Sequence, residues 1–496
     1  MEFIKKYKID ITLTLSLFIL SSFLIFTKLG TKELQNWDEG LYANIAGEMV
    51  KTGNYLDLKL QGGQWLEKEP LPFWFEALSI KIFGFNTFAL RFPAALLSIF
   101  IAPLIYIISR KKLNKMWSFF ASTLFLISPA IWFPHMLRTA DFDMLSLSLF
   151  LATLASYLYL RNKKMWWICA IFMALGLVSR GFMGIIYIGI IFIAEIIRPL
   201  FTLQKWNFKK ILTFILVSLL PWIIWHIYLF ATYTNIYLNV YWKEQFFTRI
   251  TDPLQGHVGS TSFYINFLQK EMGSLSILFF FFGILSVIYL FIKKRSWYYS
   301  FLLIWIFATL LPPHILTTKL EWYILPALPP LYISLFTIPQ TLNDFVKNKN
   351  FKKYIYGIAI VFLIIYTSSL ISQSIQKIQN IRKTSTQYFV HSIQNIIPQE
   401  QNIILYNIEN WNHGRTLPSF YWYLHYEQNL EIISINKPNL EYYLALVKEN
   451  PWWIIQTENL QDIEQFKKDF SYSVMTKNPH YMLLHITQNQ IDDNIK

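Results

Sequence analysis

Two pairs of acidic residues stand in polar segments of an otherwise apolar chain. Asp38 and Glu39 are adjacent, and Asp141 and Asp143 are separated by one residue. A carboxylate within hydrogen-bond reach of a hydroxyl group can accept its proton as a general base. Two converging pairs could also hold a divalent cation, although no zinc-type spacing of His and Cys accompanies them. Helix capping is the ordinary alternative, because both pairs stand where a helix is expected to begin.

Four cations form a second set of candidate functional residues: Lys68, Arg138, Arg180 and Lys319. Lys68 lies between Glu67 and Glu69, and the following Pro70 restricts the loop that carries it. Lys and Arg side chains gathered at one level of a membrane suit a phosphate group. A solvated charge is the alternative for Lys68, and an ion pair with a nearby Asp is the alternative for Arg138. No glycine-rich phosphate loop, Walker motif or G-x-S-x-G elbow occurs, so soluble nucleotide chemistry has no support.

The composition places these residues in a membrane protein. Of the 496 residues, 54% are hydrophobic and only 15% are charged. The single cysteine, Cys169, lies in an apolar stretch and excludes an intramolecular disulfide. The net charge of +14 does not indicate a nucleic-acid partner, because the basic residues form short clusters between apolar spans.

About eleven apolar stretches are long enough to be transmembrane helices. Their approximate bounds are 9–28, 87–109, 116–134, 142–160, 165–179, 181–197, 211–231, 273–292, 297–312, 322–338 and 354–373. We divide the stretch 165–197 at Arg180, because a single helix would bury that charge in mid-bilayer. With this division and the N-terminus inside, every dense basic cluster falls on the inner side, as the positive-inside rule requires.

The same topology gathers the remaining polar segments on the outer face. These segments are the loop 30–86, the turn 135–143, the turn at Arg180, the loop 232–272 and the turn 312–322. In the first loop, apolar residues at helical spacing predict interfacial amphipathic helices at 39–52 and from Pro70 to Gly84. The arrangement is what an active site at a membrane surface would require.

A change of composition near residue 374 predicts a second domain. Strands are expected at 402–408, 430–434, 452–456 and 481–486, with helices at 418–426, 439–449 and 460–470. The expected fold is therefore an all-α membrane bundle, residues 1–373, followed by a small extracytoplasmic α/β domain, residues 374–496.

The two halves of the first loop carry a family resemblance. The segments Trp37-Asp38-Glu39-Gly40-Leu41-Tyr42 and Glu67-Lys68-Glu69-Pro70-Leu71 resemble the D-E-x-x-Y … E-K-x-P pattern of bacterial C-type glycosyltransferases. That superfamily includes the lipid A aminoarabinose transferases and the protein O-mannosyltransferase-like enzymes of glycosyltransferase families 39 and 83. Four further segments are similar to family positions: 138–143, Arg180-Gly181, 319–326 and 415–421. Leu41 departs from the aminoarabinose transferases, which commonly carry an Arg there, so the sequence names no sugar.

The resemblance implies a donor sugar on a polyprenyl phosphate and an inverting transfer to a lipid, glycan or protein acceptor. It implies catalytic roles for Asp38, Glu39 and Asp143, with Asp38 as the base or as a carboxylate that orients the substrate. It implies donor phosphate binding by Lys68, Arg138, Arg180, Lys319 and Tyr323, with support from Tyr42, Glu67 and Asp141. A bacterial inner membrane protein with a periplasmic active site, such as an enzyme of lipid A modification, would follow. The resemblance implies no definite cofactor. The two acid pairs leave open whether the protein binds a divalent metal ion.

Two other functions compete with this interpretation. A transporter or flippase for an anionic lipid-linked sugar would place charges at mid-span on broken helices, often in repeated halves. Here the charges stand at the outer ends of the spans, and no internal repeat is visible. A receptor or scaffold built around the α/β domain gives no reason for acids and cations at several span ends.

Overall fold

A computed structural model describes residues 2–132, 135–203, 206–253, 256–379, 385–398, 401–406, 408, 417–435, 447, 450–464 and 470–488. The chain divides into two compact units, each built from three segments. The first, here called the helical unit, comprises Met1–Thr27, Leu66–Pro72 and Phe92–Asn380. The second, here called the mixed unit, comprises Lys28–Trp65, Phe73–Arg91 and Ile381–Lys496. The predicted boundary at residue 373 falls within a helix of the helical unit, and separate domains 1–373 and 374–496 stay a prediction.

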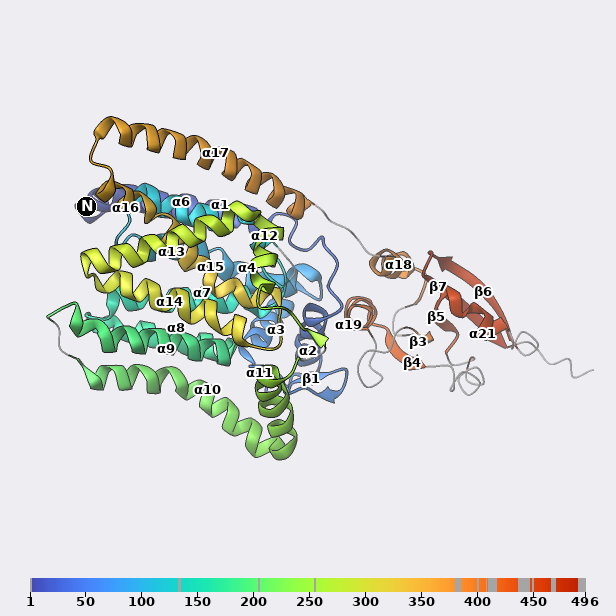
Figure 1. Ribbon diagram of the computed structural model, residues 1–496. Coiled ribbons are helices and arrows are strands. Elements are labelled where there is room, and N and C mark those ends of the chain that lie inside the picture. The colour runs from blue at the N-terminus through green and yellow to red at the C-terminus, as the bar shows by residue number, and fades with distance from the viewer. Residues whose placement is uncertain are drawn as a thin grey trace, which may run out of the picture. The chain divides into compact units, whose positions relative to one another are not determined.

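Long helices that run side by side make up the helical unit (Figure 1). Its α-helices are α1 Glu2–Phe26, α4 Thr87–Ser98 (from Phe92), α5 Ile101–Ser109, α6 Lys115–Leu126, α7 Phe142–Leu160, α8 Trp167–Ser179, α9 Gly181–Ile197, α10 Phe208–Tyr237, α11 Arg249–Thr251, α12 Phe263–Met272, α13 Ser274–Lys294, α14 Trp297–Ile315, α15 Leu328–Leu335, α16 Ile338–Phe345 and α17 Lys349–Gln379. A π-helical segment, η4 Leu238–Thr248, continues α10, and the 3₁₀ segment η6 Glu321–Ala327 precedes α15. Helix α9 packs against α14, and α7 packs against α8.

Among the described residues, eight helices are long and apolar enough to cross a membrane. The protein is therefore a multi-pass membrane protein. Each of the eleven predicted spans overlaps a helix, but the agreement is uneven. The span 87–109 contains two helices, α4 and α5, and the span 322–338 begins in the 3₁₀ segment η6. Helix α6 ends at Leu126, before the predicted end at 134, and residues 133–134 lie outside the described residues. The division at Arg180 is confirmed, since α8 ends at Ser179, α9 begins at Gly181, and Arg180 itself has φ −159° and ψ 84°.

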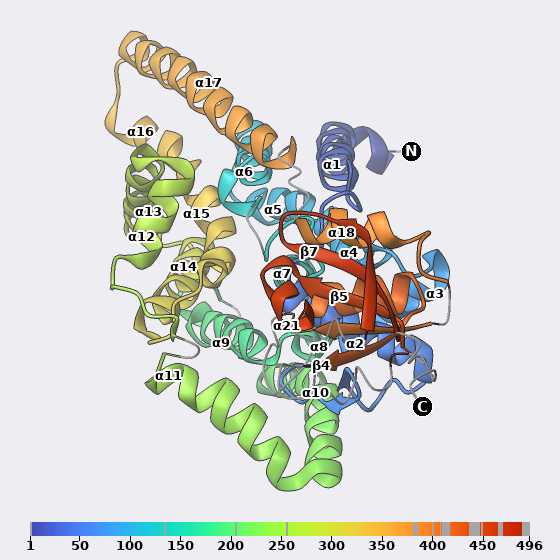
Figure 2. The same cartoon turned by 90° about the vertical axis from the view of Figure 1, so that its right-hand side faces the viewer.

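The mixed unit contains a five-stranded sheet in the order β4-β3-β5-β7-β6. Three of its strands, β4, β5 and β7, are labelled in Figure 2. The strands are β3 Asn402–Tyr406, β4 Glu431–Ile435, β5 Trp452–Gln456, β6 Phe470–Lys477 and β7 Tyr481–Gln488. Strand β3 pairs in parallel with β4 and β5, whereas β7 is antiparallel to both β5 and β6. Buried side chains such as Trp453, Tyr406 and Leu484 form its core. The predicted α/β fold is confirmed.

One strand of this sheet was not predicted. The described part of the helix expected at 460–470 is α21 Leu460–Glu464, residues 465–469 lie outside the described residues, and Phe470 is wrong as a helical residue because it begins strand β6. The residues Phe470, Tyr472 and Val474 alternate with Ser, which is the period of a strand, and β6 pairs along its length with β7. The helix expected at 439–449 falls largely outside the described residues.

The mixed unit also contains most of the first polar loop. Helix α2, Asp38–Thr52, ends at Gly53 in the left-handed conformation (φ 72°), as the glycine position predicts. The hairpin β1 Lys59–Leu60 and β2 Gly63–Gln64 follows, and then α3 Leu71–Phe83. Helix α2 packs against α19 Pro418–Tyr421 and the π-helical segment η7 Trp422–Glu427. A Cβ on Gly47 would lie 2.8 Å from the Tyr426 ring, so this glycine permits the close approach.

The residue at the end of η7 predicts a pH dependence of stability. Burial raises the pKa of Glu427 to about 7. The Trp422 indole N–H donates to Glu427 Oε1 at 2.8 Å and lowers the pKa, but burial has the larger effect. Between pH 4.5 and about 7, the folded chain keeps a proton that the unfolded chain has released. Stability therefore falls as pH rises through this window, by about 3 kcal/mol.

The substitution Glu427→Gln is expected to remove that loss. The variant should unfold at a higher temperature than the wild type at pH 8 and at nearly the same temperature at pH 5, measured on the purified full chain. Glu431→Gln is the matched control, because the Glu431 side chain is 67% exposed. Identical pH profiles for the wild type and Glu427→Gln would contradict the assignment.

Candidate functional site

In the helical unit, the turn before α7 holds a buried His–Asp pair. His135 Nδ1 lies 2.9 Å from Asp141 Oδ1, and the His135 ring stacks on Trp322 with centroids 3.9 Å apart. Asp141 occupies the N-cap position of α7, but its side chain makes no capping hydrogen bond. The capping alternative for Asp141 is therefore wrong, because His135 engages the carboxylate. Sequence analysis gave His135 no role, although its place in the polar turn was a usable signal.

The same turn contains two strained backbone positions. His135 has φ 65° and Arg138 has φ 68°, values that a residue with a Cβ seldom adopts. Arg138 donates to the carbonyl of Thr27 at 2.6 Å and to that of Ile378 at 3.4 Å. Strain of this kind persists where the surroundings hold a residue in place, and it is commonly found at functional sites.

An ion pair joins the start of α7 to the break between α8 and α9. Asp143, in the first turn of α7, is paired with Arg180, whose backbone separates the two later helices. The two side chains are 11% and 23% exposed, so both reach the surface of the unit. Asp143 and Arg180, which were predicted to share a site, are thus in direct contact.

The third predicted cation lies in the turn after α14. Lys319 Nζ donates to the carbonyls of Pro313 and His314 at 3.0 and 2.7 Å. Only 6% of the residue is exposed, and this burial lowers the pKa of Lys319 below its ordinary value. A desolvated ammonium group that is held by carbonyl oxygens provides a fixed positive charge at this end of the helix.

Both glutamates that flank Lys68 are anchored to the π-helical segment η4. Glu67 Oε2 accepts a hydrogen bond from Gln245 Nε2 at 2.9 Å, and Glu69 Oε1 accepts one from the Tyr241 hydroxyl at 2.5 Å. The Trp222 indole N–H, 3.3 Å away, also points at Glu69. Lys68 itself is half-buried. These anchors fix the loop that presents Lys68, as the adjacent prolines predict.

A polar chain continues from this loop to Tyr323. Gln245 Oε1 accepts from Arg249 Nη2 at 2.6 Å, and Arg249 Nη1 donates to the Tyr323 hydroxyl at 2.6 Å. Arg249 therefore links two predicted positions, Glu67 and Tyr323, that are more than 250 residues apart in sequence. Arg249 was not among the predicted site residues, although it is a cation in the predicted outer loop 232–272 that topology does not require.

The close packing around Glu69 gives a first steric prediction. A Cβ added to Gly181 would lie 2.5 Å from Glu69 Oε1 and would also collide with the Trp222 indole. We expect Gly181→Ala to displace the Lys68 loop and to lower the unfolding temperature, at a cost of about 1–3 kcal/mol. Gly189→Ala on the same helix is the matched control, because nothing lies within 4 Å of its added Cβ. Equal unfolding temperatures for the two variants would contradict this packing.

Within the mixed unit, the motif around Asp38 has one buried and one accessible acid. Glu39 is fully buried and forms a two-pronged ion pair with Arg91, with Oε1–Nε 2.6 Å and Oε2–Nη2 3.0 Å. Tyr42 is also buried, edge-on to Trp65 and Phe73. Asp38 is partly exposed and is the first residue of helix α2. The N-cap position, where Asp38 was expected, is occupied by the preceding residue, Trp37.

The His135–Asp141 pair offers two possible metal ligands in the helical unit. The atoms His135 Nδ1 and Asp141 Oδ1 lie 2.9 Å apart, and both side chains are buried. An imidazole and a carboxylate suit several divalent ions, but two ligands do not complete a coordination shell. The pair can therefore contribute to a metal site, and nothing in the described residues assigns the ion.

Comparison with known proteins relates this arrangement to a family. The family model for dolichyl-phosphate-mannose-protein mannosyltransferases matches residues 67–225. An undecaprenyl phosphate-alpha-4-amino-4-deoxy-L-arabinose arabinosyl transferase from Shewanella sediminis is 24% identical over 343 residues. The crystal structure of ArnT from Cupriavidus metallidurans bound to undecaprenyl phosphate superimposes with a TM-score of 0.69 at 15% identity, covering 96% of this chain and 97% of that one. This likeness shows that the chain shares the fold of that structure.

Further comparisons set the extent of the likeness. An uncharacterised protein from Aquifex aeolicus is 27% identical over 346 residues, 68% of this chain and 65% of that protein. The Shewanella alignment covers 66% of this chain and 60% of its relative, so the chain spans less than two thirds of either relative. The oligosaccharyltransferase AglB from Archaeoglobus fulgidus, solved with an inhibitory peptide and a dolichol-phosphate, matches with a TM-score of 0.56 at 14% identity, covering 99% of this chain and 75% of that one. Another structure of that oligosaccharyltransferase contains Zn and sulfate. The predicted fold, a helical membrane bundle with a small α/β domain, is confirmed.

Proposed function

We propose that this protein is an integral-membrane glycosyltransferase that moves a sugar from a polyprenyl-phosphate donor to a lipid, glycan or protein acceptor. The observation that carries the proposal is a set of linked charged groups at helix ends in a GT-C fold. These groups are the Asp143–Arg180 pair, Lys319, and the chain from Glu67 through Arg249 to Tyr323. A flippase is less well supported, because Arg180 and Lys319 stand at helix ends rather than at mid-span.

The proposed reaction is a displacement at the anomeric carbon of the donor sugar. The bond between that carbon and the phosphate oxygen breaks, and a bond to the acceptor hydroxyl oxygen forms with inversion. The proton of the hydroxyl passes to Asp38, and the leaving group departs as polyprenyl phosphate. Positive charge fixed at the leaving phosphate stabilises the transition state, which is commonly the largest single contribution to catalysis.

The cations near the helix ends would supply that charge. We assign donor phosphate binding to Lys68, Arg138, Arg180, Lys319 and Tyr323, and the structure adds Arg249 as the residue that positions the Tyr323 hydroxyl. The ion pair with Asp143 would hold Arg180 in place until the phosphate of the donor takes over as its partner. Asp141, Glu67 and Tyr42 would support the site through the contacts described above.

The relatives suggest the first substrates to test. Undecaprenyl phosphate forms part of the Shewanella protein's name, and it is bound in the Cupriavidus structure. We therefore propose an undecaprenyl-phosphate sugar as donor and lipid A as the first acceptor to test. The positive-inside rule supports an inner-membrane protein whose site faces the periplasm. The His135–Asp141 pair supports adding a metal chelator to the assay.

The deciding experiment incubates the purified full chain with a panel of undecaprenyl-phosphate sugars. Lipid A, a lipid-linked glycan and a Ser/Thr-containing peptide are the acceptors, each with and without EDTA, and products are identified by mass spectrometry. Glycosyltransfer is expected to add one sugar mass to the acceptor and to release undecaprenyl phosphate. Movement of labelled lipid across reconstituted vesicles without a new glycosidic bond would instead establish a flippase.

A further inference from the structure

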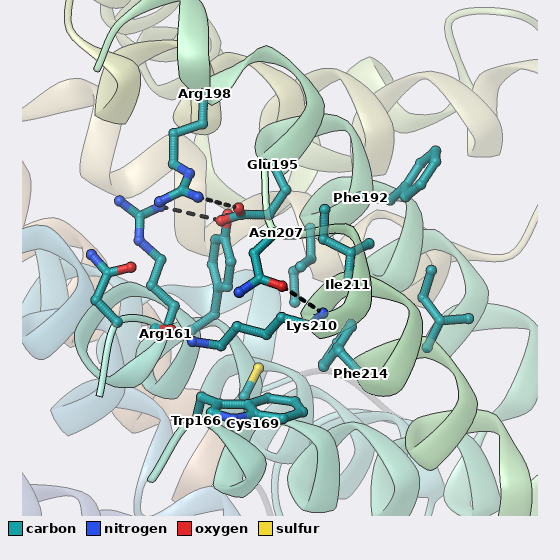
Figure 3. A pocket seen from close by; sticks show the side chains of 14 residues that line it. Arg161, Trp166, Cys169, Phe192, Glu195, Arg198, Asn207, Lys210, Ile211 and Phe214 are labelled. Carbon is teal, nitrogen blue, oxygen red and sulfur yellow. Dashed lines mark hydrogen bonds and ion pairs between the residues drawn. The ribbon is translucent and has the colours of Figure 1, made fainter. Parts of the chain in front are cut away.

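A cavity lies at the opposite end of α7 and α9 from the residues discussed so far. It has a volume of about 230 Å³ and is lined by four helices of the helical unit and the segments that join them (Figure 3). Asp143 and Arg161 stand at the two ends of α7, which rises about 27 Å between them. Arg180 and Arg198 mark the two ends of α9 in the same way. The cavity is therefore a second site, separated from the first by nearly the thickness of the hydrocarbon core.

A buried carboxylate organises the charged wall of this cavity. Glu195 is 9% exposed, and its Oε2 lies 2.9 Å from Arg198 Nη2. Its Oε1 accepts from the Tyr157 hydroxyl at 2.5 Å and lies 3.5 Å from Arg161 Nη1. The side chains of Arg161, Glu195 and Arg198 point toward one another (Figure 3). The Arg161 guanidinium also lies 3.9 Å above the Trp297 ring, so its position is fixed from both sides.

The charges that line the cavity do not balance. Arg161, Arg198 and Lys210 line it together with a single carboxylate, Glu195, which leaves an excess of two positive charges. Arg198 is only 5% exposed, so water does not fully solvate this charge. A desolvated excess of positive charge is costly unless an anion offsets it. The cavity is therefore electrostatically suited to a negatively charged ligand.

Size and lining narrow the class of ligand. The volume is below the roughly 300 Å³ at which pockets for drug-sized ligands begin, so a headgroup fits but a whole lipid does not. Ile191, Phe214 and Ile215 provide an apolar wall, and Phe192, which also lines the cavity, is 41% exposed at the surface of the bundle. A ligand that combines a phosphate with an apolar tail would satisfy both parts of the lining.

We propose that this cavity binds the phosphate headgroup of an anionic phospholipid. By the positive-inside rule, this end of α7 and α9 faces the cytoplasm, where anionic lipids are enriched and attract Lys and Arg. Topology alone would require exposed basic residues, as at Lys209, but would not require a cavity or a buried Glu195. The proposal is independent of the glycosyltransferase function.

The test compares two adjacent lysines. Lys210 lines the cavity, whereas Lys209 is exposed and does not, so Lys210→Met and Lys209→Met remove the same charge from neighbouring positions. The purified full chain is titrated with phosphatidylglycerol in mixed micelles, and bound lipid is counted by native mass spectrometry. Lys210→Met should bind phosphatidylglycerol roughly five-fold more weakly than the wild type. Lys209→Met and the wild type should bind equally, and phosphatidylcholine should bind weakly to all three.

Separate arms test the source of the phosphate and the integrity of the variants. Glycerol 3-phosphate and inorganic phosphate are titrated by thermal shift. If glycerol 3-phosphate or inorganic phosphate raises the unfolding temperature of the wild type but not of Lys210→Met, the cavity is a phosphate site that also takes a free anion. If the wild type binds phosphatidylglycerol but responds to neither small anion, the ligand is the lipid. A normal unfolding temperature for lipid-free Lys210→Met shows that the variant is folded. If it is not folded, Arg161→Gln, which also removes a positive charge from the cavity, takes its place in the same titration. Equal binding of phosphatidylglycerol by both lysine variants and the wild type would overturn the proposal.

Discussion

Asp38→Asn is expected to lower the rate of sugar transfer by roughly 10²–10⁴-fold, because the variant loses the proposed general base. The amide keeps the size of the carboxylate but cannot accept the acceptor proton. The KM for the donor should change little, since the donor phosphate is assigned to Lys68, Arg180 and Lys319. Steady-state measurements with a donor and acceptor pair identified by mass spectrometry would separate the two parameters.

The matched control for this prediction is Asp57→Asn in the same loop. Asp57 is paired with the partly exposed Lys59 at 3.1 Å, and exposed ion pairs contribute about 0–1 kcal/mol. Asp57→Asn should therefore retain both transfer activity and stability. Transfer at the wild-type rate by Asp38→Asn would remove Asp38 from the catalytic assignment, whereas loss of activity in both variants would indicate a general disturbance of the loop.

The sequence predicts features that follow from the cost of placing a group in lipid. An arginine within an apolar stretch of more than thirty residues has to reach an interface, and the observed break at Arg180 satisfies that requirement. Helices α7 and α9 begin and end within one residue of the predicted spans for the same reason. The left-handed end of α2 at Gly53 likewise follows from local chemistry.

Other features depend on partners that no local pattern encodes. The sequence places Asp38 and Glu39 side by side, but the partner of Glu39 is Arg91, which lies 52 positions later. Arg249 stands out in the sequence only as a cation in the predicted outer loop, and its hydrogen bond to Tyr323, 74 positions later, depends on the folded chain. In contrast, the error at β6 was avoidable, since Phe470, Tyr472 and Val474 already show the period of a strand.

The contrast between Asp38 and Glu39 leads to a second large effect, on folding. Glu39 and Arg91 are 0% and 1% exposed, and Arg91 also donates to the carbonyls of Leu29, Lys32 and Glu33 at 2.7–3.0 Å. Removing one partner of a buried ion pair typically costs 3–5 kcal/mol, because the other charge stays buried without compensation. Glu39→Gln should therefore lower the unfolding temperature of the purified chain by roughly 3–5 °C.

A double-variant comparison shows whether this effect belongs to the ion pair. Arg91→Met should also destabilise the chain, and Glu39→Gln combined with Arg91→Met should cost less than the sum of the two single changes, because neither charge is then left alone. Glu39→Gln that unfolds at the wild-type temperature but no longer transfers sugar would show instead that Glu39 acts in catalysis, as the family resemblance implies. Because Glu39 is fully buried against Arg91, whereas Asp38 is partly exposed, we expect the loss of stability, and we expect Asp38 to carry the chemistry of the motif.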